Sequence, residues 1–187
     1  MDDELVVRAR DGDEAAFALL ANRMAHRLHG VAYRILRDVA LAEDAVQLAL
    51  LRSWQDLPQL RDPARFEAWS YRILVRICYA QAKQARKRLA EVPLSDLDAS
   101  TPGDDYSAVV ERDALERGFV ELSVEQRTVV VLHHYLGLPM AEVADTVDAP
   151  LETVRSRMRR ALAALRAALE ADTRTANASE TRTKVSA

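Results

Sequence analysis

Basic and hydroxyl side chains are concentrated in one stretch near the C-terminal end of the chain. Five arginines fall between residues 155 and 166 with no acidic residue among them. Guanidinium and hydroxyl groups are donors for phosphate oxygens and for base edges in the DNA major groove. A basic helix face that is simply solvated is the alternative interpretation. The pattern favours DNA binding by a group of neighbouring side chains: Thr153, Arg155, Ser156, Arg157, Arg159 and Arg160.

A second group of cations is interrupted by an aromatic residue. Arg72, Arg76, Tyr79 and Lys83 follow one another at steps of four, three and four residues, which places them on one side of a helix. Cations can follow DNA phosphates and an aromatic ring can stack on an unpaired base, as expected for DNA that is partly single stranded. Trp69 lies one turn earlier, although an aromatic residue in such a helix is more often part of the core.

A third candidate surface lies on a helix expected at about residues 39–57. This helix is apolar nearly all round, with Asp44, Gln47, Leu48 and Leu51 beside the main apolar stripe. Burial of an unpaired Asp44 carboxylate in a core would be costly. The sequence therefore favours a docking face for a protein partner over complete burial of this helix.

Helices must position all three surfaces, and the first 90 residues have helical periodicity. We expect a short helix near residues 3–10, a long one opened by Asp13 as N-cap, the helix at 39–57, and another that starts at Asp62 and Pro63. In the last of these the sequence predicts a buried stripe of four residues: Phe66, Trp69, Ile73 and Ile77. These helices are predicted to form one domain over residues 1–90.

The remainder of the chain predicts a linker and a second helical domain. Residues 91–107 are rich in Asp, Ser and Pro, which indicates a flexible acidic linker. Within a domain at 108–171, Ser123 and Gln126 have the spacing of a capping box that opens a helix through Leu136. The last residues, 172–187, are predicted to be a disordered tail.

Two helices around a tight turn have helix-turn-helix dimensions. A short helix after Pro139 leads to Asp148-Ala149-Pro150, and a longer helix follows. Its inward stripe is predicted to be Val154, Met158, Ala161 and Leu165. The fold class expected is therefore all-α, with two small helical domains and a helix-turn-helix in the second one.

Composition excludes several classes of function. The 187 residues contain five glycines, too far apart for a phosphate-binding loop, and a single cysteine, Cys78. The one possible metal pair, His26 and His29, has no third ligand nearby, so we expect no metal, no cofactor and no enzymatic activity. No secretory signal is visible and no apolar stretch approaches the roughly 20 residues that span a bilayer. We expect a cytoplasmic protein without membrane insertion.

Three successive segments resemble bacterial sigma factors of the extracytoplasmic-function (ECF) group. They are DVALAEDAVQLALLRSW at 38–54, RFEAWSYRILVRICYAQAKQARKR at 65–88, and LSVEQRTVVVLHHYLGLPMAEVADTVDAPLETVRSRMRRALAALR at 122–166. The resemblance covers about residues 10–170 in the same order. Asp148 stands where the family commonly has glycine in the turn, and aspartate tolerates a left-handed backbone better than most residues.

The resemblance implies a subunit that binds core RNA polymerase and directs it to promoter DNA. The helix with Asp44 and Gln47 would grip the coiled coil of the largest polymerase subunit. The loop and helix at about residues 59–79, with Arg61 and Arg65, would open and hold the minus-ten element. The helix after Pro150 would read the minus-thirty-five element, and an anti-sigma factor is a possible further partner.

Two rival functions can be compared with this interpretation on the residues alone. An autonomous helix-turn-helix regulator with a sensing N-terminal domain would bind duplex DNA without polymerase, which a gel shift with and without core enzyme would reveal. A small hydrolase or metal enzyme has no support in the sequence.

Overall fold

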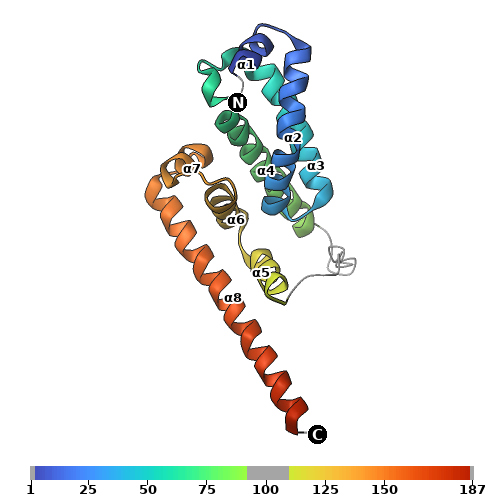
Figure 1. The fold of residues 1–187 in the computed structure, drawn as a ribbon, viewed down its shortest axis with the longest axis vertical. Coiled ribbons are helices and arrows are strands. Elements are labelled where there is room, and N and C mark those ends of the chain that lie inside the picture. Colours follow the sequence, from blue (N-terminus) through green and yellow to red (C-terminus); the bar gives the residue numbers. More distant parts are fainter. Residues whose placement is uncertain (1–2, 92–109, 186–187) are drawn as a thin grey trace.

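The chain folds into two groups of helices. The computed structural model describes residues 3–91 and 110–185, and within these ranges it contains helices and no strand (Figure 1). The N-terminal group consists of α1 (Asp3–Arg10), α2 (Glu14–Leu36), α3 (Val39–Asp56) and α4 (Phe66–Glu91). Two 3-10 turns, Leu57–Gln59 and Pro63–Arg65, join α3 to α4. The all-helical prediction is confirmed.

The C-terminal group packs beside α4. It consists of α5 (Val110–Glu121), α6 (Val124–Val130), a π-helical turn (Val131–Tyr135), α7 (Met140–Val147) and α8 (Leu151–Val185). Helix α8 runs along α5, α6 and α7 (Figure 1). Helices α2 and α4 contact α6, and α4 also contacts α7, so the two groups touch one another. The predicted linker, apart from Glu91, lies outside the described residues.

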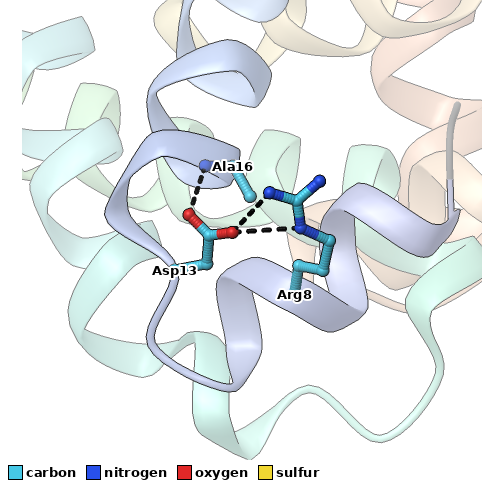
Figure 2. Close-up of polar contacts among 3 residues, drawn as sticks. All are labelled: Arg8, Asp13 and Ala16. Carbon is cyan, nitrogen blue, oxygen red and sulfur yellow. Dashed lines mark hydrogen bonds and ion pairs between the residues drawn. The ribbon is translucent and has the colours of Figure 1, made fainter.

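Helix α2 begins at Asp13, as the sequence predicted. The Asp13 carboxylate accepts a hydrogen bond from the Ala16 backbone N–H at 3.0 Å and two from the Arg8 guanidinium, at 3.0 and 2.6 Å (Figure 2). The Ala16 N–H, followed by the hydrogen bonds from Arg8, lowers the pKa of Asp13 below its ordinary value. This carboxylate fixes the start of α2 and ties α1 to it.

Asp13 makes the stability of the fold dependent on pH. Its pKa is lower in the folded chain than in the unfolded chain, so its contribution is complete above the unfolded pKa and is lost as pH falls through the folded pKa. Asp13→Asn keeps a capping side chain but loses the charge. We expect wild type to be the more stable at pH 7 and this difference to shrink below about pH 4.

Urea denaturation of both proteins between pH 3 and pH 7 measures that difference. Asp11→Asn is the control, because Asp11 lies in the same connection between α1 and α2 but makes only a long ion pair. Its Oδ1 lies 3.9 Å from Nε of Arg10. A stability difference for Asp13→Asn that does not vary with pH would show that the ionised carboxylate contributes nothing.

Apolar residues of α2 at steps of three and four form much of the core of the N-terminal group. Leu20, Met24, Leu28, Val31 and Ile35 are all buried. Phe17, at the start of the same stripe, is half-buried, and its ring packs on Trp54 of α3 with centroids 4.9 Å apart.

The predicted inward face of α4 packs against the core, but it is not the most deeply buried face of the helix. Phe66 is buried, but Trp69, Ile73 and Ile77 are only half-buried. The buried positions are instead Ser70, Tyr71, Leu74, Val75 and Cys78. Helix α4 lies against α3 and α2 and also against α6 and α7, so apolar side chains cover more than one face of it. The spacing of apolar residues along α4 could not show which of these faces of the helix is the most deeply buried. Burial raises the pKa of the Cys78 thiol to about 12.

The local signals of the C-terminal group are confirmed. Ser123 and Gln126 form a reciprocal capping box at the start of α6. The helix does not continue to Leu136 as an α-helix, because the chain widens into the π-helical turn, where the Leu136 N–H donates to the Val131 carbonyl at 3.1 Å. Gly137 then has a φ of +72°, which suits a residue without a Cβ.

The last helix is longer than predicted. The sequence predicted a disordered tail from residue 172, whereas the helical backbone of α8 continues to Val185. No glycine or proline occurs between residues 151 and 185, so no residue type in this stretch interrupts the helix. Among the described residues, no helix combines the length and the apolar character needed to cross a bilayer.

Candidate nucleic-acid interface

The turn between α7 and α8 has the geometry that a helix-turn-helix requires. Asp148 ends α7 in the left-handed region, with φ 53° and ψ 52°. The Ala149 N–H donates back to the Ala144 carbonyl, and the Val154 N–H donates to the Pro150 carbonyl at the start of α8. Asp148 thus adopts the conformation that glycine commonly supplies at this point.

Helix α8 separates an apolar face from a basic one. Val154, Met158, Ala161 and Leu165 are all buried, as predicted. On the other side three of the predicted DNA-binding residues are exposed, and the other three are half-buried. The exposed residues are Arg155, Arg159 and Arg160, and the half-buried ones are Thr153, Ser156 and Arg157.

An open hollow lies beside this basic face. Its volume is about 480 Å³, and six residues line it: His133, Met140, Glu152, Arg155, Met158 and Arg159. Arg155 is held there by Glu152, whose Oε1 lies 2.5 Å from Nη1 of the arginine. Nδ1 of the His133 ring lies 2.8 Å from the carbonyl oxygen of Leu138. Sequence reasoning did not find His133 or Met140, because their place beside α8 depends on the π-helical turn.

The cationic stripe on α4 is divided by the neighbouring helices. Arg76 and Lys83 are exposed. Arg72 donates two hydrogen bonds to the Asp145 carbonyl of α7, with its Nε at 3.0 Å. The Tyr79 hydroxyl is buried without a hydrogen-bond partner. The structure therefore leaves Arg76 and Lys83 exposed, whereas Arg72 and Tyr79 are half-buried.

The segment before α4 adds further cations. Arg61 and Arg65 are exposed, and Arg65 lies 3.4 Å from Asp62, the residue that caps the 3-10 turn. Trp69 packs on Phe66 with ring centroids 6.0 Å apart and stays half-buried. These side chains share the end of the molecule where α4 begins.

The predicted docking face on α3 is open to solvent. Asp44, Gln47, Leu48 and Leu51 are all exposed, and the two leucines expose 45% and 51% of their surface. The opposite face of the helix, including Ala42, Ala45 and Ala49, is buried against α2 and α4. Two exposed leucines one turn apart form an apolar contact with polar residues at its edge, which is typical of a protein interface.

No cluster of three or more His, Cys, Asp or Glu side chains in the described parts of the chain could hold a metal ion. The described residues thus present two basic surfaces, on α8 and at the start of α4, and one exposed apolar face, on α3.

Comparisons with known proteins match both groups of helices. Residues 20–88 match the model of sigma-70 region 2, and residues 118–167 match the model of sigma-70, region 4. The ECF RNA polymerase sigma factor SigM of Mycobacterium tuberculosis is 33% identical over 165 residues, covering 88% of this chain and 82% of SigM. The RNA polymerase sigma-H factor of Pseudomonas aeruginosa is 29% identical over 181 residues, covering 90% of this chain and 94% of that protein.

Solved structures extend the similarity to three dimensions. CnrH, solved with the cytosolic domain of CnrY, matches with a TM-score of 0.64 and 27% identity, covering 91% of this chain and 98% of CnrH. The sigma factor RpoE of Bartonella quintana, solved with the anti-sigma factor NepR, has the same TM-score at 21% identity, covering 82% of this chain and 96% of RpoE, and shows the fold alone.

The predicted family is therefore confirmed by order of regions, by sequence and by fold. Its members are not enzymes, in agreement with the sequence, and they give RNA polymerase its choice of promoter. The chain belongs to the ECF sigma factors of the sigma-70 family and directs RNA polymerase to initiate transcription.

Proposed function

We propose that the exposed face of α3 binds core RNA polymerase. The observation that carries this proposal is the pair of exposed leucines, Leu48 and Leu51, with Asp44 and Gln47 on the same solvent-facing side. An apolar contact of this kind is desolvated on binding, while polar residues at its edge set the orientation of the partner. The face lies within the segment that matches region 2.

The start of α4 and the turns before it bind the minus-ten element in this proposal. Arg61, Arg65, Arg76 and Lys83 supply exposed cations for the DNA backbone. Trp69, Arg72 and Tyr79 lie among them and supply ring and guanidinium contacts to unpaired bases. Holding unstacked bases is how a subunit without catalytic groups favours the opening of a duplex.

The first turns of α8 bind the minus-thirty-five element. Arg155, Arg159 and Arg160 project from the exposed side of the helix that follows the turn, where a recognition helix meets base edges. Thr153, Ser156 and Arg157 flank them and contact phosphates. In this assignment the N-terminal domain of the protein spans residues 1–90 and its C-terminal domain spans residues 108–171.

An anti-sigma factor is the regulatory partner that we propose for this chain. The support is that RpoE was solved with the anti-sigma factor NepR, and CnrH with the cytosolic domain of CnrY.

Transcription in a reconstituted system tests the assignment of these surfaces. We expect the chain and core polymerase together to start RNA at a restricted set of sites on a library of genomic fragments, and neither alone to do so. In a gel shift, specific DNA binding is expected only when core enzyme is present. Specific binding of duplex by the chain alone would instead indicate an autonomous regulator.

A further inference from the structure

Three side chains that can bind a soft metal ion line the hollow beside α8. They are His133, Met140 and Met158. His133 belongs to the π-helical turn, Met140 is the first residue of α7, and Met158 lies on the buried side of α8. Three separate elements therefore bring an imidazole and two thioethers to one open hollow.

The His133 ring is held as a metal-binding histidine is. Its Nδ1 lies 2.8 Å from the carbonyl oxygen of Leu138. Because a carbonyl oxygen only accepts hydrogen bonds, Nδ1 carries the ring proton and Nε2 keeps its lone pair. Histidines that bind metals almost always donate their other ring N–H to a carboxylate, a backbone carbonyl or water. The structure thus holds His133 in the tautomer that binds a metal through Nε2.

The two methionines can bring their sulfur atoms to the same ion. Met140 is half-buried, and Met158 exposes 7% of its surface at the wall of the hollow. Methionine is unbranched and has three rotatable bonds, so its sulfur can change position without a change of the backbone. The hollow is open on one side, which gives an ion access to all three side chains.

These donor atoms select a soft ion of low charge. Thioether sulfur favours Cu(I), whereas Mg²⁺ and Ca²⁺ prefer oxygen ligands. An imidazole and two thioethers are all neutral, so nothing in the set offsets the second positive charge of a divalent cation. A monovalent soft cation is therefore the class of ion that fits.

The charged residues of the hollow are compatible with one added positive charge. Glu152 pairs with Arg155, with 2.5 Å between Oε1 and Nη1, so the two together carry no net charge. Arg159 is exposed, and water and salt screen its repulsion. A monovalent ion meets this one solvated cation, and a divalent ion would be repelled more strongly.

We propose that His133, Met140 and Met158 form a Cu(I) site at the edge of the helix-turn-helix, with Nε2 and two sulfur atoms as ligands. The expectation of no metal considered His26 and His29 and took no account of thioethers. Clusters of His, Cys, Asp and Glu, which the described residues lack, are likewise a different set of ligands. The site does not depend on the roles proposed for α3, α4 or α8 in transcription.

Silver nitrate is the probe, because Ag(I) shares the ligand preferences of Cu(I) and is stable in air. The full chain, with isotope-labelled methionine methyl groups, is titrated in chloride-free buffer near neutral pH and followed by NMR. We expect the methyl signals of Met140 and Met158 to shift together and to stop shifting at one equivalent of silver. Met24, which is buried in the N-terminal group, is the internal control, and its signal should not move.

Matched variants identify the ligands. Met140→Leu and Met158→Leu conserve the apolar volume and remove the sulfur. His133→Gln keeps a donor for the Leu138 carbonyl and removes the ring nitrogen, and His134→Gln is its control at the exposed neighbouring position. Competition with bicinchoninate measures the affinity for Cu(I). We expect this affinity to fall at least about tenfold in each of the first three variants and to be unchanged in His134→Gln.

Each outcome decides the proposal. Silver that leaves the signals of Met140 and Met158 in place, or that moves Met24 equally, overturns the site, and capture of silver by the Cys78 thiol would have the first of these results. Equal loss of affinity in His133→Gln and His134→Gln, or no loss in either, overturns the assignment of His133. Equal shifts with zinc sulfate overturn the selection of a soft ion. The titration of the unsubstituted chain decides the site even where a variant fails to fold by circular dichroism.

Discussion

Replacing Asp44 and Gln47 together by alanine is expected to lower the affinity for core RNA polymerase at least about tenfold, equivalent to about 1.4 kcal/mol. Both side chains are exposed on α3 beside Leu48 and Leu51, so their removal should cost binding and leave the fold intact. Exposed substitutions usually change stability by less than about 0.5 kcal/mol, so the thermal midpoint should stay within a few degrees of wild type.

Binding of the purified variant to core enzyme, by biolayer interferometry or gel filtration, measures this effect. Glu43→Ala is the matched control, because Glu43 is exposed on the same helix but lies outside the proposed contact. A double variant that unfolds would show that the two residues support the fold. One that is folded and binds core enzyme normally would remove α3 as the docking face.

The second large effect is expected at the start of α8. Arg155→Ala combined with Arg159→Ala should weaken promoter binding of the holoenzyme by about 1–3 kcal/mol for each side chain that reads a base edge. If a side chain contacts phosphate instead, its loss should weaken binding uniformly across sequences and reduce the dependence on salt. Gel shifts with matched and scrambled upstream elements at several salt concentrations separate the two roles.

Glu152 and Arg166 provide the comparison variants for this helix. Glu152→Ala removes the partner that holds Arg155 and leaves both arginines in place. Arg166→Ala removes an exposed cation two turns beyond Arg159. We expect Arg166→Ala to bind as wild type does. Unchanged affinity and salt dependence in the double arginine variant would contradict the assignment of α8 as the recognition helix.

The sequence predicted best the features that depend on neighbouring residues. The Asp13 cap, the Ser123 capping box and the turn at Asp148 each involve side chains or backbone groups a few residues apart, and the structure confirms them. The inward stripe of α8 is equally local, since one face of that helix packs against its own group.

Contacts between distant segments account for what the sequence did not predict. Arg72 and the Asp145 carbonyl are 73 residues apart in the chain, and Arg127 and the Ile35 carbonyl are 92 apart. Helical spacing places Arg72 and Tyr79 on one stripe, but it contains no information about which helix of another group covers that stripe. For the same reason the spacing found residues of α4 that pack against the core but not the most deeply buried ones, since two groups of helices bury different sides of it.

The state of Cys78 has a practical consequence for chemistry on this protein. Burial raises the pKa of the Cys78 thiol to about 12 and leaves it no exposed surface, so the reactive thiolate is scarce at pH 7 and a reagent cannot reach the sulfur. Maleimides and thiol oxidants should therefore spare Cys78 in the folded chain, whose only cysteine this is. A cysteine introduced at the surface can carry a dye without removal of the native one. The rate at which a thiol reagent modifies Cys78 then reports how often α4 unfolds.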